Sequence, residues 1–340
     1  MNLNPREKVF LVIMISVALI SLSVSVYLGI NQTCTNIKDC INNKIGVIDT
    51  GSNVDKNFKE KYEGLKNKIG KYDVVSYNPP MHSGTLSAAD WNQITQDIQK
   101  MYNKYDAFVL LASHDSIPYT ASALAFMLEN LGKPIVFSDG DLSDALVLAS
   151  QTRAPEVSVA FNGKLFRGTR TVANASKGFW SPHYPPLDTK SALSRPKEIF
   201  QPKMIDPRNK IDVIKVYPGM NSTDLIPYLN KQGLQGIILE LWGEGTGPNS
   251  PEFFKVINEL AKKGVVIVAV SQYDHVGYDY EIDVRLLEAG VLSGHDMTTP
   301  AAYAKLAFLL SNVKDKKLIG QLMDINFRGE QTLPYKKSKR

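Results

Sequence analysis

Cysteine is scarce in this chain, and its position limits what it can do. The 340 residues include only Cys34 and Cys40, both close to the amino terminus. The remainder has no disulfides and must be stabilised by a hydrophobic core. In an oxidising compartment the two cysteines could close a small loop or cross-link two chains, and in a reducing one they would stay unpaired thiols.

The sequence also lacks features that particular classes of function require. The net charge of +5 lies partly in a short tail at 335–340, without a basic face interleaved with aromatics, so we predict no nucleic-acid partner. No fixed-period repeat indicates a solenoid. Residues 243–247 (GEGTG) look like a phosphate loop but lack its lysine and serine. No His-x-x-x-His spacing occurs, and we predict no cofactor and no metal, with His82, His114 and Asp115 as a speculative alternative.

A long uncharged run is present near the amino terminus. Residues 9–30 carry no charge and follow Arg6 and Lys8. As a helix this run would be about 33 Å long, enough to cross a bilayer. The positive-inside rule predicts a cytosolic tail at 1–8, a signal-anchor at 9–30, and a single-pass type II protein whose large carboxyl-terminal part is extracellular or lumenal. A cleavable signal peptide is the alternative, although its apolar core is normally only about 7–15 residues.

The segment after the run agrees with this topology. Residues 31–44 would form a stem that carries both cysteines. Asn31, Asn174 and Asn221 each begin an Asn-x-Ser/Thr sequence, so we predict them as glycosylation sites.

The remaining composition, 44% hydrophobic and 21% charged overall, suits one or two globular domains. Residues 106–137 predict a buried strand, a polar turn at 113–118, a helix and a second strand. A polar turn at the carboxyl end of a buried parallel strand is where open α/β sheets place ligands. The turn is therefore the first candidate site.

Strands and helices alternate along the rest of the chain. We expect strands at 44–49, 72–77, 157–161, 164–168, 212–217, 236–241 and 265–270. We expect helices at 87–102, 144–150, 222–232, 250–263, 284–289 and 300–311, and a helix or loop at 56–71. This alternation predicts an α/β fold with mostly parallel sheets. A proline-rich linker at 191–211 would separate a domain at 45–190 from one at 212–332, with a basic tail at 333–340.

Six segments of the chain resemble one known family. They are YTASALAFMLENLGKP at 119–134, LFRGTRT at 165–171, SPHYPPL at 181–187, WGEGTGP at 242–248, AGVLSGHDMT at 289–298 and FRGE at 327–330. Together they resemble the type I (cytosolic-type) bacterial L-asparaginases of the asparaginase-glutaminase family, over roughly residues 45–332. The resemblance implies a two-domain α/β fold and a homo-oligomer, a dimer or tetramer, in which a neighbouring subunit helps to build each site.

The resemblance also implies where catalytic residues would stand. Asn53 occupies the position of the nucleophilic threonine, His114 that of a second threonine, and Ala173 that of the lysine that assists proton removal. Asp115 matches the aspartate that holds the substrate's α-amino group, and Ser83 matches one serine of the substrate loop. An amide and a methyl group can neither attack a carbonyl nor accept the proton, so the family's catalytic triad is degraded.

Two positions of the family's allosteric asparagine pocket are also changed. Its arginine corresponds to Glu240 and its cysteine to Tyr273. Thr50 could be proposed as a substitute nucleophile, but a structural role in the turn is favoured. We interpret His275 and His295 as surface loop residues.

These observations lead to one hypothesis and two alternatives. The hypothesis is a membrane-anchored, asparaginase-like protein without catalytic activity that serves as a binding or assembly module. Its expected partners are the membrane, through 9–30, and a small amino-acid ligand near Asp115, Ser83, Asn53 and His114. The alternatives are a divergent amidohydrolase with a non-standard nucleophile and a structural surface or envelope component.

Overall fold

The structure is a computed structural model that describes residues 43–51, 71–139, 142–174, 178–182, 184–188, 190–243, 245–273 and 283–332. The predicted span at 9–30, Cys34 and Cys40, Asn31 and Asn53 lie outside these residues. Within the described part, no helix is both long enough and apolar enough to cross a membrane.

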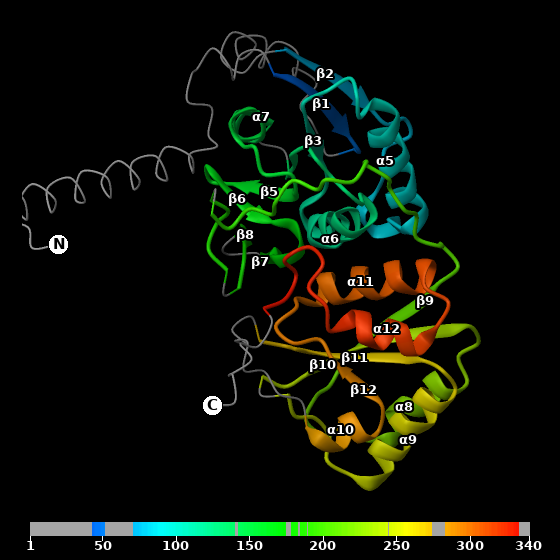
Figure 1. Ribbon diagram of the computed structural model, residues 1–340. Helices are drawn as coiled ribbons and strands as arrows, with labels where there is room; N and C mark the ends of the chain where they lie inside the picture. Colours follow the sequence, from blue (N-terminus) through cyan, green and yellow to red (C-terminus); the bar gives the residue numbers. More distant parts are fainter. Residues whose placement is uncertain are drawn as a thin grey trace, which may run out of the picture.

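The first domain is built on a six-stranded sheet in the order β2-β1-β3-β4-β5-β6 (Figure 1). In that order the strands are Lys71–Ser76, Lys44–Asp49, Ala107–Leu111, Ile135–Ser138, Val157–Phe161 and Lys164–Arg167. Every pair is parallel except β5 with β6, which form the predicted hairpin. Strand β3 (AFVLL) is buried along its whole length, because helices cover both faces of the sheet.

Helices on the two faces of this sheet enclose separate cores. Helices α5 (Ala88–Met101) and α6 (Ile117–Met127) cover one face, and α7 (Leu142–Gln151) covers the other. Ser87 begins α5 with a capping box to Asp90, as the serine before an apolar run predicted. The expected inward residues Trp91, Ile94 and Ile98 are all buried.

The second domain is built on a four-stranded parallel sheet in the order β12-β11-β10-β9. The strands are Val291–Ser293, Val266–Ser271, Leu234–Leu241 and Lys210–Lys215. Its helices are α8 (Ser222–Leu229), α9 (Pro251–Lys262), α10 (Val284–Glu288), α11 (Thr299–Asn312) and α12 (Lys316–Met323). Helices α8, α9 and α10 pack on one face, and α11 and α12 lie on the face that looks toward the first domain (Figure 1).

The two domains share one hydrophobic core. Helices α6 and α11 pack against each other between the sheets (Figure 1), and the rings of Phe126 and Phe308 lie 6.2 Å apart. The linker adds to this contact, although it has no regular structure. Ile205 is 1% exposed and exchanges two hydrogen bonds with the side chain of Asn92 on α5. The domains are therefore tightly joined.

The structure adds elements that periodicity did not predict. A small antiparallel pair, β7 (Val172–Asn174) and β8 (Gly178–Trp180), follows the first sheet. Strand β12 and helix α12 were also not predicted. The other predicted strands and helices within the described residues are confirmed, with shifts of a few residues at their ends.

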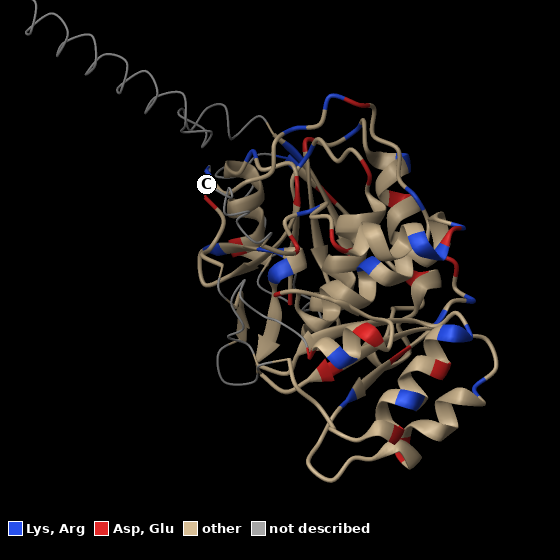
Figure 2. Ribbon diagram, turned by 60° about the horizontal axis from the view of Figure 1, so that its bottom comes forward, with Lys and Arg blue, Asp and Glu red and all other residues tan. Residues whose placement is uncertain are grey.

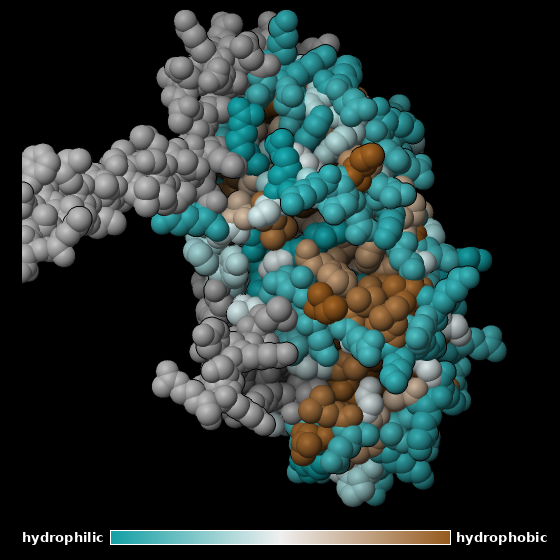
Figure 3. Space-filling view, viewed as in Figure 1, coloured by the Kyte–Doolittle hydropathy of each residue, from teal (hydrophilic) through white to brown (hydrophobic). Residues whose placement is uncertain are grey.

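Charged and hydrophobic residues are distributed differently over the outer surface. Figure 2 shows acidic and basic residues interspersed over the helices of both domains. Figure 3 shows hydrophobic atoms gathered over α10, β12 and α12 of the second domain. We call this surface the apolar patch; its exposed large side chains are Val284, Leu287, Leu318 and Ile325.

Candidate functional site

Strands β1, β3 and β4 are parallel neighbours, so their carboxyl ends meet at one edge of the first sheet. Thr50, directly after β1, is 3% exposed, and its hydroxyl donates a hydrogen bond of 2.8 Å to the carbonyl of Leu111. The amide of Thr50 donates to the same carbonyl. The hydroxyl thus joins two strands, which supports the structural role expected of Thr50.

Gly51 allows the turn after β1 to lie close to Pro80 in the loop after β2. Gly51 has φ +113°, and a Cβ there would lie 2.4 Å from Cβ of Pro80. The turn after β1 therefore packs directly on the loop after β2. Only glycine combines this backbone conformation with this contact.

His114 opens the turn after β3, within the short 3₁₀ helix His114–Ser116. Its Nδ1 lies 2.9 Å from Oδ2 of Asp139, which follows β4. Its ring lies against Phe179, with centroids 4.3 Å apart. The side chains of His114 and Asp139 are 35% and 30% exposed, so solvent reaches this pair. The carboxylate orients the imidazole in a way that a general base would need.

His82 and Ser83 lie in the loop after β2, and both are exposed. Across the described residues, no three His, Cys, Asp or Glu side chains are close enough together to hold a metal ion. His82, His114 and Asp115 are therefore not assembled into the speculative metal site, and His114 pairs with Asp139 instead.

A cleft of about 330 Å³ opens between the two domains. We call it the interdomain cleft. It is lined by Asp115, Pro118, Tyr119, Val172, Ala173, Pro182, Lys215, Glu240, Ser271, Gln272, Tyr273, His295, Asp296, Met297, Thr298, Thr299 and Pro300. The first domain contributes the start of α6 and strand β7. The second contributes the carboxyl ends of β9, β10 and β11 and the start of α11.

Charged groups of both signs face this cleft. Asp115 is exposed on the side of the first domain, and Lys215 is exposed on the side of the second. Oε1 of Glu240 accepts a hydrogen bond of 2.6 Å from the hydroxyl of Thr299. Burial raises the pKa of Tyr119, and the Glu240 carboxylate raises it further, so the phenol stays neutral beside an acid. The cleft therefore presents a carboxylate on the side of the first domain and an ammonium group on the side of the second.

A buried ion pair closes the inner side of the cleft. Nη1 of Arg170, on the first domain, lies 2.8 Å from Oδ2 of Asp296, and both side chains are 2% exposed. Nε of Arg170 donates to the carbonyl of Gly329, and the amide of Thr332 donates to Oδ1 of Asp296. Residues 326–332, which we call the C-terminal strap, are thereby tied to both domains.

The strap is also held by a buried ion pair with α11. Nζ of Lys305 on α11 lies 2.8 Å from Oε1 of Glu330, and neither side chain is exposed. Burial lowers the pKa of Lys305, and the Glu330 carboxylate opposes that shift. The amides of Phe327 and Arg328 donate to the same carboxylate, so the charge of Glu330 is fully hydrogen-bonded.

Two family models match this arrangement of two domains. "Asparaginase, N-terminal" matches residues 44–195, and "Glutaminase/Asparaginase C-terminal domain" matches residues 210–323. The chain belongs to the asparaginase family.

Individual relatives agree with this assignment. L-asparaginase 1 of Escherichia coli (strain K12) is 35% identical over 291 residues, which cover 77% of this chain and 85% of that protein. The 60 kDa lysophospholipase of Mus musculus is 32% identical over 296 residues, 77% of this chain but only 51% of that longer protein. The crystal structure of L-asparaginase I from Vibrio cholerae O1 superimposes with a TM-score of 0.78 at 33% identity, covering 86% of this chain and 100% of that chain.

In this asparaginase-family chain, the predicted site residues do not all lie together. Asp115 and Ala173 both line the interdomain cleft, where Ala173 presents a methyl group. His114 pairs with Asp139 and is not among the residues that line the cleft. Asn53 lies outside the described residues.

Two of the three predicted glycosylation positions lie within the described residues, one on the second domain and one on the small strand pair. Asn221 caps α8, where its Oδ1 accepts from the amide of Thr223. Asn174 ends β7.

Several cleft residues were missed by sequence reasoning or given another role. His275, interpreted as a surface loop residue, lies outside the described residues. His295 was given the same interpretation and does lie in the turn between β12 and α11, but a place in the cleft was not predicted for it. Its side chain is 19% exposed, lines the cleft and has Nε2 3.3 Å from Oδ1 of Asp324. Lys215 and Thr299 were not singled out at all. Their sequence signal is their place in the second domain. Lys215 lies near the carboxyl end of the predicted strand at 212–217, and Thr299 directly precedes the predicted helix at 300–311. Sheets of this kind gather ligands at the carboxyl ends of their strands.

Proposed function

We propose that this asparaginase-family protein does not hydrolyse amides by the family's mechanism and acts as a binding or assembly module. The observation that carries the proposal is the loss of the attacking and proton-accepting groups from the positions that the family uses. An amide stands at Asn53 and a methyl group at Ala173. The hydroxyl of Thr50, already committed to the carbonyl of Leu111, supports the same conclusion.

The proposed ligand is a small amino acid held in the interdomain cleft. Asp115 would receive its ammonium group, as the aspartate at this position does in the family. Lys215, on the opposite side of the cleft, supports a contact with its carboxylate.

Two measurements on the purified chain test this function. Ammonia release from L-asparagine and L-glutamine is expected to stay at the level of a blank. L-Aspartate or L-asparagine is expected to raise the melting temperature of the parent chain and not that of Asp115→Ala. Glu288→Ala, which removes an exposed carboxylate at the end of α10, is the matched control and should keep the response.

The outcomes separate the candidate functions. Ammonia release that Asp115→Ala abolishes would refute the binding-module proposal. The absence of both turnover and any ligand-induced shift would favour a structural surface or envelope component.

A divergent amidohydrolase is the second candidate, and the paired His114 and Asp139 favour it. An imidazole oriented by a carboxylate can remove a proton from a hydroxyl or from water. This function requires that His114→Ala and Asp139→Asn abolish amide hydrolysis, while Asp188→Asn, a control at an exposed aspartate elsewhere, does not.

We further propose that residues 9–30 anchor the protein as a type II membrane protein and that it forms a homo-oligomer. The uncharged run supports the anchor, and the apolar patch supports an oligomer because exposed apolar areas often mark interfaces. A mobility shift on deglycosylation, lost in Asn174→Gln and Asn221→Gln, would test whether the globular part crosses the membrane.

A further inference from the structure

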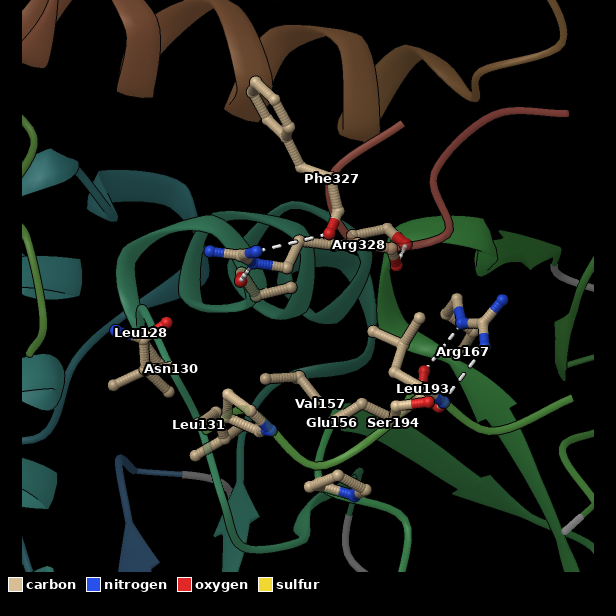
Figure 4. Close-up of a pocket in the computed structure, with 14 residues that line it drawn as sticks. Leu128, Asn130, Leu131, Glu156, Val157, Arg167, Leu193, Ser194, Phe327 and Arg328 are labelled. Atoms are coloured by element: carbon tan, nitrogen blue, oxygen red, sulfur yellow. Dashed lines mark hydrogen bonds and ion pairs between the residues drawn. The ribbon is translucent and has the colours of Figure 1, made fainter. Parts of the chain in front are cut away.

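A second cavity, of about 180 Å³, lies away from the interdomain cleft and shares no lining residue with it. We call it the strap cavity. It is enclosed by the carboxyl end of α6, the start of β5, the linker and the strap residues Phe327 and Arg328 (Figure 4). Nothing in the proposed function uses this space.

The walls of the strap cavity are largely apolar. Ala125, Leu128 and Leu131 come from the end of α6 and the segment after it, and Val157 begins β5. An apolar cavity of about 150 Å³ is large enough to bind benzene. At 180 Å³, the strap cavity can hold the apolar body of a ligand of this size.

One cation at this cavity is not matched by an acid of its own. Arg167 and Glu156 are 2% and 3% exposed and form a bidentate pair with a shortest distance of 2.6 Å. Glu129 pairs with Lys203 at 2.7 Å. Nη2 of Arg328 lies 3.6 Å from Oε1 of the same carboxylate, an ion pair that is longer than a hydrogen bond, so Arg328 and Lys203 share one acid.

The guanidinium of Arg328 is nevertheless held in place. Its Nε donates to the carbonyl of Ala125 at 3.0 Å, and its Nη1 donates to the carbonyl of Phe327 at 3.2 Å. Figure 4 shows this guanidinium on one side of the cavity and the Arg167–Glu156 pair on the other. Nε and Nη1 fix its orientation, and Nη2, whose contact with Glu129 is too long for a hydrogen bond, can donate to a ligand.

We propose that the strap cavity binds a small monocarboxylate with a compact apolar body. The carboxylate contacts Nη2 of Arg328, and the body lies against Leu128, Leu131 and Val157. An anion is favoured over a neutral molecule because Arg167 and Glu156 neutralise each other, whereas Arg328 and Lys203 share the single carboxylate of Glu129 and leave one positive charge in excess. The proposal is independent of what binds in the interdomain cleft.

Binding at this position has a consequence for the strap. The hydroxyl of Thr169 donates to the carbonyl of Arg328 at 3.1 Å, and Arg170 donates to the next carbonyl, that of Gly329. A ligand that holds Arg328 therefore stabilises the strap against local opening. Slower amide hydrogen exchange in residues 326–332 is the local sign of an occupied cavity.

Benzoate is the probe, and neutral benzamide, of nearly the same shape, is its control. Titration calorimetry on the full chain is expected to detect benzoate binding with at least tenfold higher affinity than benzamide. At about 100 times the dissociation constant, benzoate should raise the melting temperature by about 5 °C and slow exchange in the strap.

Two variants locate the site, and a third controls for charge. Arg328→Gln should weaken benzoate binding at least tenfold, and Ala125→Leu, which fills the cavity without altering the guanidinium, should do the same. Arg208→Gln removes an arginine whose side chain is 90% exposed and should change nothing. If Arg328→Gln does not fold, the benzoate affinity of Ala125→Leu still tests the proposal.

Equal affinity for benzoate and benzamide would overturn the proposal. So would undiminished benzoate binding by Ala125→Leu, or the lack of any benzoate binding by the parent chain.

Discussion

Replacing Arg170 by methionine should destabilise the protein more than any exposed substitution. The guanidinium of Arg170 and the carboxylate of Asp296 are both 2% exposed, and Arg170 also donates to the carbonyl of Gly329 and the hydroxyl of Thr332. Removing one partner of a buried ion pair leaves the other charge uncompensated, which typically costs about 3–5 kcal/mol. Methionine fills part of the volume but makes none of these bonds.

The expected loss of stability can be measured as a decrease in the melting temperature. With an unfolding entropy of about 2.1 cal/mol/K per residue, 1 kcal/mol corresponds to roughly 1.5 °C for a chain of this length, so the melting temperature of Arg170→Met should fall by roughly 5–8 °C. Circular dichroism during heating and urea unfolding would measure it. Adding Asp296→Asn removes the orphaned charge, so the double variant should be more stable than the sum of the single changes predicts.

An exposed pair provides the control. Arg208 pairs with Asp206 at 2.7 Å, but its side chain is 90% exposed. Arg208→Met should therefore leave the melting temperature unchanged within error. The reasoning fails if Arg170→Met changes stability by less than about 1 kcal/mol, or if the two substitutions at the buried pair are strictly additive.

Three further predictions concern other parts of the chain. Gly51→Ala should lower the melting temperature by several degrees in a thermal scan, because its φ of +113° and the 2.4 Å approach to Pro80 both exclude a Cβ; an unchanged value would mean that the turn relaxes without cost. The pKa of Asp73 is held below 3.8, chiefly by the hydrogen bond from Tyr105, so that bond stabilises the fold above about pH 4 and its contribution is lost as pH falls through the lowered pKa. Tyr105→Phe should thus lower stability in urea titrations at pH 7 and have less effect near pH 2, and an equal effect at both values would contradict this sign. Leu318→Asp in the apolar patch should reduce the molar mass measured by light scattering, whereas an unchanged mass would place the subunit interface elsewhere.

Local rules predicted the fold well where the signal lies within a single element. The continuous apolar run of β3 is buried throughout, and the capping box at Ser87 begins α5. The same rules miss β7, β12 and α12. The two strands are three residues long, so a period of two residues is hardly repeated within them. Their stability depends on contacts with distant segments, which local patterns do not contain.

The candidate site was predicted less completely, for a related reason. The turn at 113–118 was correctly placed at the carboxyl end of a buried strand, but the partner of His114 was not. Asp139 is 25 residues away, and only the order of strands in the sheet brings it within 2.9 Å. His295 was missed in the same way, since its position in the cleft depends on how the second domain faces the first.

Three of the six segments that resemble the family make buried ion pairs that join distant parts of the chain. Arg170 lies in LFRGTRT, Asp296 in AGVLSGHDMT and Glu330 in FRGE, and all three make buried ion pairs. Each such pair has to be completed by a partner from another segment, because a buried charge without one costs several kcal/mol. Substitution at any of these positions would therefore endanger the whole fold. Ala173 is exposed and Asp115 lies at the mouth of the cleft, so replacement there alters chemistry and leaves the core intact. If Ala173 and His114 stand at the family's catalytic positions, as the proposed function holds, this difference in structural cost explains why such replacements leave the asparaginase fold intact.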